Sequence, residues 1–210
     1  MSTDDPQVAP AGADDYPDLR TLSDARTLRA LAHPVRIALL ETLTLGGAMT
    51  ATEVGERIGE SPTTCSFHLR QLAKYHFVEE AGGGKGRARP WKISSVGLRW
   101  GTSTGDPEVD LAASAVARLF RDRQLERYRT FRESSASYPQ KWRTAASDSE
   151  YLFHLTAEEL VELNDQLHAI LLAFHRDRLV DPSSRPAGAV PVELLLFTYP
   201  IELPTEEGNS

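Results

Sequence analysis

Apolar residues recur at helical spacing between Ser61 and Lys74. Cys65, Leu69 and Leu72 fall at positions i, i+4 and i+7, which places them on one side of a helix. Ser61 is a good N-cap because its hydroxyl can accept a hydrogen bond from a backbone N–H of the first turn, and Pro62 suits the position after it. The other side carries short hydroxyls, one aromatic ring and two cations. The pattern therefore predicts a capped helix with an apolar back and a polar front.

The segments on either side of this helix complete a recognisable order. Residues 51–59 predict a short helix with Val54 and Ile58 inward, and residues 77–80 and 90–94 predict two short strands. The nine residues between the strands include four glycines and three cations, and a basic hairpin tip of this kind can follow a phosphate backbone or enter a narrow minor groove. Helix, tight turn, capped helix and hairpin is the order of a winged helix-turn-helix.

This order makes the polar front of the second helix the candidate DNA contact surface. The candidate DNA-binding residues are Ser61, Pro62, Thr63, Thr64, Ser66, Phe67, His68, Arg70, Gln71 and Lys74 on the helix, and Lys85, Arg87 and Arg89 at the hairpin tip. We expect Arg70 to reach a base edge or an adjacent phosphate, and the hydroxyls to make short hydrogen bonds. The alternative is a winged helix that serves only protein contacts.

The remaining patterns predict a mainly α fold with a small β component. A helix is expected from Pro17-Asp18 to Ala32, and a second from Pro34 to Leu45, ending at two glycines. Residues 97–105, rich in Gly, Ser and Thr, predict a linker. A long amphipathic helix is then expected from about Asp106 to Glu133; its six arginines are interpreted as a solvated face with local acidic partners rather than as a second nucleic-acid surface.

The last third predicts a small strand-helix-strand unit. Residues 151–156 have strand composition, Thr156 and Glu159 form a capping-box pattern at the start of a helix that runs to about Arg178, and residues 190–199 predict a second strand. The predicted organisation is a disordered tail at 1–17, a winged helix-turn-helix domain at 18–96, a linker at 97–105, a dimerisation and effector region at 106–200 and a disordered tail at 201–210.

Two segments carry a resemblance to a known family. Residues 31–40 (LAHPVRIALL) and residues 66–72 (SFHLRQL) resemble the second helix and the recognition helix of ArsR-type winged-helix transcriptional regulators, over roughly residues 18–96. The layout is similar to that of larger actinobacterial members. The resemblance implies a homodimeric regulator, usually a repressor, that binds a near-palindromic operator. It also implies a dimer interface on the first and long helices, with Leu19, Leu22, Val116 and Phe120 as candidates.

The chain departs from the metal-sensing members of that family. Those members carry paired cysteines where this chain has residues 52–56, and Cys65 is the only cysteine of the chain. We interpret Cys65 as a small buried hydrophobe rather than a redox sensor. Asp165, His168 and His175 could bridge an ion between two helices, but their spacing is also typical of solvated surface pairs. We therefore predict no metal site, no cofactor and no catalytic residue.

The distribution of charge agrees with a DNA-binding segment. The net charge of the chain is −7, yet residues 19–95 carry eleven Lys and Arg against seven Asp and Glu. The positive segment is therefore the one expected to contact DNA. No apolar run is long enough to cross a membrane, so we expect a cytoplasmic protein. The predicted function is a sequence-specific transcriptional regulator; the alternatives are a protein-interaction module and a metal- or redox-responsive sensor. One hypothesis for its control is a small molecule held among Trp100, Tyr128, Phe131, Trp142 and Phe153, and the alternative is that these aromatic side chains only fill the core.

Overall fold

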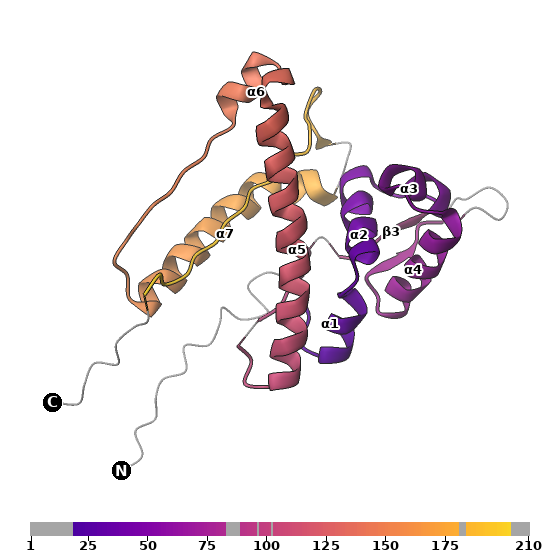
Figure 1. Ribbon diagram of the computed structural model, residues 1–210, viewed down its shortest axis with the longest axis horizontal. Helices are drawn as coiled ribbons and strands as arrows, with labels where there is room; N and C mark the ends of the chain where they lie inside the picture. Colours follow the sequence, from indigo (N-terminus) through magenta and orange to yellow (C-terminus); the bar gives the residue numbers. More distant parts are fainter. Residues whose placement is uncertain (1–18, 83–88, 96, 102, 181–183, 203–210) are drawn as a thin grey trace, which may run out of the picture. The chain divides into compact units, whose positions relative to one another are not determined.

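The computed structural model describes residues 19–82, 89–95, 97–101, 103–180 and 184–202 (Figure 1). The chain divides into two compact units. Of the described residues, 19–147 belong to the N-terminal unit and 148–202 belong to the C-terminal unit. The proposed tails at 1–17 and 201–210 lie outside the described residues, except for Ile201 and Glu202. The long helix that we assigned to the C-terminal region belongs to the N-terminal unit.

The N-terminal unit is mainly helical, as predicted. Its elements, in chain order, are β1 (Leu19–Thr21), α1 (Ala25–Leu31), α2 (Pro34–Gly46), α3 (Ala51–Ile58), α4 (Pro62–Lys74), β2 (Val78–Glu80), β3 (Trp91–Ile93), β4 (Gly97–Arg99), α5 (Pro107–Ser134), η2 (Ser135–Ser137) and α6 (Gln140–Ala145). The helices α2, α3 and α4 and the strands β2 and β3 stand in the order of a winged helix-turn-helix, which confirms the predicted fold class.

Helices α1 to α5 each begin after an N-cap residue whose side chain accepts a hydrogen bond from a backbone N–H of the first turn. The hydroxyl of Thr50 accepts from the backbone N–H of Glu53, and the Glu53 carboxylate accepts from the N–H of Thr50, which completes a capping box at the start of α3. Asp106 caps α5 by accepting from the backbone N–H of Glu108 at 2.8 Å. Local chemistry therefore accounts for where these helices start.

The wing is a small antiparallel sheet. Strands β2 and β3 pair with Val78 opposite Ile93 and Glu80 opposite Trp91. On the other side of β3, Met49 forms an antiparallel bridge with Trp91, through N–O distances of 3.0 and 2.7 Å. The residues before α3 are thereby tied to the hairpin that follows α4.

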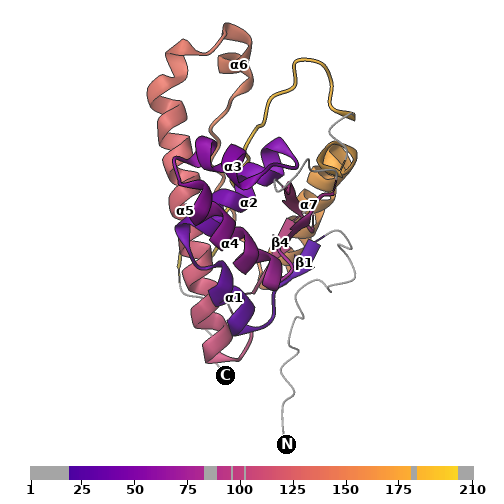
Figure 2. The same cartoon turned by 90° about the vertical axis from the view of Figure 1, so that its right-hand side faces the viewer.

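A second strand pair corrects two predictions. Residues 19–21 form strand β1, not the start of a helix, and residues 97–99 form strand β4, not a linker; the two strands pair in parallel (Figure 2). Helix α1 begins only after Asp24, whose carboxylate accepts from the N–H of Thr27 at 2.8 Å. Strands β1 and β4, of three residues each, form because they pair with each other across a long stretch of sequence. A local sequence pattern cannot predict such a pairing.

Two of the four dimer-interface candidates are covered within one chain. Leu22 and Val116 are buried in the core of the N-terminal unit, so neither presents surface to a second copy. Phe120 is partly buried, with its ring centroid 5.4 Å from that of Trp100. Leu19 lies in strand β1, which pairs with β4 rather than forming part of a helix.

Helix α5 packs along α1 and is also tied to α2 (Figure 1). Val109, Ala112, Ala113 and Val116 bury one face of α5. Further along, Glu41 of α2 accepts hydrogen bonds from two arginines of α5: Arg123 through Nε and Nη2 at 2.9 and 2.8 Å, and Arg127 through Nη1 at 2.9 Å. The expected local pairing holds for Arg129 with Glu126, but Arg123 and Arg127 bind a distant carboxylate instead.

The C-terminal unit contains one helix, α7 (Ala157–Val180), among its described residues. The predicted capping box is present, with Thr156 and Glu159 exchanging hydrogen bonds of 2.8 and 3.2 Å. The two predicted strands are not formed: residues 151–156 and 190–200 adopt no regular secondary structure, and neither segment belongs to a sheet of the described chain. Strand composition alone does not make a strand, because the ladder needs a second edge. None of the described helices combines the length and apolar character that a membrane crossing requires.

Candidate nucleic-acid interface

The back of α4 is anchored in the core of the N-terminal unit. Cys65, Leu69 and Leu72 are fully buried, which confirms the predicted apolar stripe. Burial raises the pKa of the Cys65 thiol, and the nearby Glu60 carboxylate raises it further. A buried thiol with a raised pKa is a poor nucleophile, so Cys65 packs as a small hydrophobe.

The front of α4 presents the predicted polar surface. Thr63, Phe67, Arg70 and Lys74 are exposed, and the Phe67 ring has 52% of its surface open. Thr64, Ser66 and Gln71 are half-buried beside them. The Nε of Arg70 donates to the Ser66 carbonyl at 3.1 Å, which lays the guanidinium along the helix surface and leaves its remaining N–H groups for other acceptors.

The start of α4 is fixed by its cap rather than by a contact outside the chain. Ser61 Oγ accepts from the backbone N–H of Thr64 at 3.0 Å and lies 2.8 Å from Thr64 Oγ1. Pro62 occupies the first turn. The hydroxyls of Ser61 and Thr64 therefore hold the end of the helix, and the positive end of the helix dipole lies beside them.

His68 does not lie on the exposed front of α4, which corrects its assignment as a DNA-binding residue. Only 8% of its surface is exposed, and its Nδ1 accepts from Arg36 Nε at 3.4 Å. Its ring centroid lies 4.4 Å from that of His33, the N-cap of α2. Burial lowers the pKa of His68, and the neighbouring His33 and Arg36 lower it further. Position 68 follows Cys65 by three residues, a spacing that could have placed it on the buried side.

Arg36 is a structural residue of this surface that sequence reasoning missed. Its Nε donates to His68 on α4, and its Nη1 donates to the carbonyl of Ala30 near the end of α1. One side chain of α2 therefore links the helices before and after it. Because Arg36 and His68 are far apart in the sequence, no spacing pattern predicts this contact.

Gly55 sets the close approach of α3 to the turn before α4. Its carbonyl accepts from the N–H groups of Gly59 and Glu60, and Gly59 adopts the left-handed conformation with φ of 73°. A Cβ added at Gly55 would lie 2.6 Å from the carbonyl oxygen of Glu60. The helix-turn-helix geometry at this point therefore requires glycine.

Two cations of the wing form ion pairs with neighbouring glutamates. Arg89 pairs with Glu80 at 2.7 Å, and Lys92 pairs with Glu79 at 3.0 Å, all four side chains being well exposed. Lys85 and Arg87 lie outside the described residues. Exposed pairs of this kind are weak, so Arg89 can exchange Glu80 for a phosphate at little cost.

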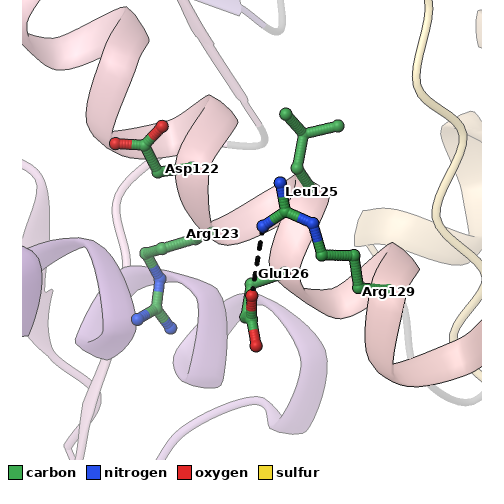
Figure 3. A pocket seen from close by; sticks show the side chains of 5 residues that line it. All are labelled: Asp122, Arg123, Leu125, Glu126 and Arg129. Atoms are coloured by element: carbon green, nitrogen blue, oxygen red, sulfur yellow. Dashed lines mark hydrogen bonds and ion pairs between the residues drawn. The ribbon is translucent and has the colours of Figure 1, made fainter. Parts of the chain in front are cut away.

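Two of the aromatic residues suggested for an effector pocket contact rings outside the suggested set. Trp100 packs on Phe120, and Phe131 lies edge-on to Tyr138 with centroids 5.2 Å apart. A depression does lie along α5. It is lined by Asp122, Arg123, Leu125, Glu126 and Arg129 (Figure 3). One helix supplies all five side chains, and most of them are charged, which does not suit an apolar ligand.

Within the described part of the chain, no three His, Cys, Asp or Glu side chains are grouped so that they could hold a metal ion. Asp165 is half-buried and His168 is exposed on α7. The side chain of His175, the third residue of the suggested set, lies outside the described part.

Comparison with known proteins identifies the central segment. A family model described as a helix-turn-helix domain matches residues 31–81. No curated protein matches the chain. Among solved structures, a MarR family regulator from Neisseria meningitidis, NMB1585, is similar at 17% identity and a TM-score of 0.30, over 71% of this chain and 76% of that one.

Lactococcus lactis ZitR, as an apo C30AH42A mutant, is similar at 14% identity and a TM-score of 0.26, over 71% of this chain and 83% of the other. Scores this low do not establish a shared fold along the whole chain. The matched segment contains α2, α3, α4 and β2 with the geometry described above. Residues 31–81 are thus a helix-turn-helix domain, and the domain supports a DNA-binding transcriptional regulator.

Proposed function

We propose that this protein is a sequence-specific transcriptional regulator of the ArsR type that binds a near-palindromic operator as a homodimer and represses transcription. The observation that carries the proposal is the exposed front of α4, where Thr63, Phe67, Arg70 and Lys74 face outward while the back of the helix is buried. Two such helices in a dimer enter successive major grooves roughly 34 Å apart. The positive charge of residues 19–95 supplies the attraction to phosphates.

Binding to tiled DNA tests the proposal directly. Fluorescence anisotropy is measured for duplexes that cover the region upstream of the protein's own gene, at two salt concentrations and with random DNA as competitor. Tight binding to one near-palindromic tile, resistant to the competitor, is the expected result. Equal and salt-sensitive binding to every tile would contradict sequence specificity, and no binding to any duplex would favour the alternative of a protein-interaction module.

Arg70 and Lys74 are expected to play different roles on the operator. Arg70→Ala removes the guanidinium nearest the centre of the exposed face and should cost about 1–3 kcal/mol on the operator but little on random DNA, as a bidentate base contact would. Lys74→Ala, at the end of the helix, should weaken all duplexes alike and lower the salt slope by about 1. Arg26→Ala, an exposed arginine on α1, is the matched control and should leave both affinities unchanged.

Lys85 and Arg87 complete the proposed interface through the wing. Arg87→Ala should weaken binding to every duplex and lower the salt slope by about 1, because a hairpin tip follows the phosphate backbone. An unchanged slope would remove Arg87 from the interface. The proposal includes gating by a small molecule as a property of the dimer, while Trp100 and Phe131 each pack on another ring of the N-terminal unit.

A further inference from the structure

One aromatic side chain lies in the middle of the polar front of α4. Phe67 follows Thr63 by one turn and precedes Arg70 by one turn, and 52% of its surface is exposed. The helix-turn-helix domain contains two further Phe or Tyr side chains, of which Phe77 is buried and Tyr75 is half-buried. A single exposed apolar side chain is ordinary elsewhere on a protein surface, but this one occupies the face that enters the major groove in the proposed complex.

The Phe67 ring is supported by the buried side of the helix. Its centroid lies 5.1 Å from that of the His68 ring, and the two rings are nearly perpendicular, with an angle of 76° between their planes. His68 is itself buried and accepts from Arg36 Nε at 3.4 Å. Because Phe67 contacts an anchored ring, it loses less conformational freedom on binding than a side chain that projects freely into solvent.

Hydrogen-bonding side chains flank this ring. Arg70 Nε donates to the Ser66 carbonyl at 3.1 Å, so the guanidinium lies back along the helix towards the turn that carries Phe67. Gln71, which is half-buried, follows Phe67 by four residues and lies on the same side of the helix. The front of α4 therefore combines one apolar group with polar groups over about two helical turns.

The 5-methyl group of thymine is the apolar feature that a base pair can offer to such a ring. The other groups that base pairs present in the major groove are hydrogen-bond donors and acceptors. A phenyl ring pressed against a donor or an acceptor would leave it without a partner, which weakens binding. Against a methyl group, the same ring buries apolar surface on both molecules.

We propose that Phe67 recognises a thymine of the operator through the 5-methyl group of that base. The inference rests on the proposed function, because it names the base that one residue of the proposed interface reads. Each copy of a homodimer carries one Phe67, so the operator contains one such thymine in each half-site.

The position of this thymine is restricted by the geometry of α4. Phe67 and Arg70 are one helical turn apart, which is about 5.4 Å along the helix axis, whereas stacked base pairs are about 3.4 Å apart. The thymine therefore lies within about two base pairs of the base that Arg70 contacts. In the experiment below, the position that responds to Phe67 should lie within this distance of the position whose base preference is relaxed by Arg70→Ala.

Removal of single methyl groups from the DNA tests the proposal. The probe is the duplex that the full-length wild type selects from a randomised library, synthesised with deoxyuridine in place of each thymine in turn. Deoxyuridine pairs with adenine as thymine does and lacks only the methyl group. Replacement of the proposed thymine in one half-site should weaken binding about four-fold in fluorescence anisotropy, and replacement in both half-sites about 16-fold, as expected for the loss of one and two buried methyl groups.

Variants of two neighbouring side chains show which one contacts the methyl group. Phe67→Ala should bind the thymine and deoxyuridine duplexes equally, and its unfolding midpoint should stay close to that of the wild type because more than half of the Phe67 surface is exposed. Phe67→Leu, which keeps an apolar side chain, should retain a preference for thymine. The matched control is Thr63→Ser, which removes the methyl group of another exposed side chain on the same face, keeps its hydroxyl and should retain the four-fold difference.

The outcomes separate this inference from the proposed function. A wild type that selects no sequence from the library contradicts the proposed function and base recognition together. A wild type that selects a sequence in which deoxyuridine replaces every thymine without loss overturns the recognition of a methyl group and leaves the proposed function supported. A four-fold difference that persists in Phe67→Ala, or that disappears in Thr63→Ser, overturns the role of Phe67.

Discussion

Substitution of Gly55 by alanine tests whether the recognition helix is positioned by the close approach of α3 to the turn before it. The added Cβ would lie 2.6 Å from the Glu60 carbonyl oxygen and 3.5 Å from Cys65 Sγ. The Glu60 backbone cannot withdraw freely, because its N–H donates to the Gly55 carbonyl at 3.0 Å. Forcing a methyl group into such a contact costs about 1–3 kcal/mol.

Helix propensity alone would make Gly55→Ala stabilising, so the sign of the change in the free energy of unfolding shows whether the steric contact outweighs it. Alanine stabilises a helix interior by about 1 kcal/mol relative to glycine. We therefore expect Gly55→Ala to lower the free energy of unfolding by about 1 kcal/mol in a urea titration, and to weaken operator binding because α4 shifts relative to α3. Gly101→Ala is the control, since the added Cβ meets only Thr104 Cγ2 at 3.5 Å and should be neutral. If Gly55→Ala stabilised the protein by about 1 kcal/mol, the steric argument would be refuted.

Three further predictions concern buried or bridging side chains. Burial and nearby groups lower the pKa of His68, so below about pH 6.5 the unfolded chain binds a proton that the folded chain does not. The free energy of unfolding should therefore be constant above that pH and fall below it. His68→Asn, which keeps an acceptor for Arg36, should flatten this slope in urea titrations. The thiol of Cys65 should stay unreactive towards a disulfide reagent in the folded protein and react fully after unfolding; rapid native reaction would contradict its burial. Glu41→Gln should lower the free energy of unfolding by about 1 kcal/mol. In a protein that already carries Arg123→Gln, the same substitution should lower it much less, because the ion pair is already lost. Glu126→Gln, which changes a solvent-exposed pair, should leave the free energy of unfolding unchanged.

The sequence predicted the parts of the fold that local chemistry determines. The stripe of Cys65, Leu69 and Leu72, the cap at Ser61 and the capping box at Thr156 each act over a few residues, so spacing alone identifies them. The exposed face of α4 followed from the same reasoning. The prediction was wrong for His68, because the buried side of the helix that Cys65, Leu69 and Leu72 define also includes residues that lie between them in the sequence.

Features that depend on contacts between residues far apart in the sequence could not be predicted from spacing. Strands β1 and β4 are short, and each exists because the other lies beside it. The bonds from Arg36 to α4 and from Glu41 to α5 join side chains that no periodicity relates. The C-terminal segments show the converse, because their composition predicts strands that the single chain does not pair.

The parallel pair of β1 and β4 also governs when the N-terminal unit can be completed during translation. Leu19 leaves the ribosome long before Gly97, the residue that it opposes. At the usual elongation rate of about 5–20 residues per second, strand β1 waits roughly 4–16 seconds for its partner. During that interval the helices α1 to α4 can form, but the first strand has no ladder to join. Truncations that end before β4 should therefore leave the backbone of β1 without its ladder, and the N-terminal unit is finished only after α5, which packs along α1, has followed β4.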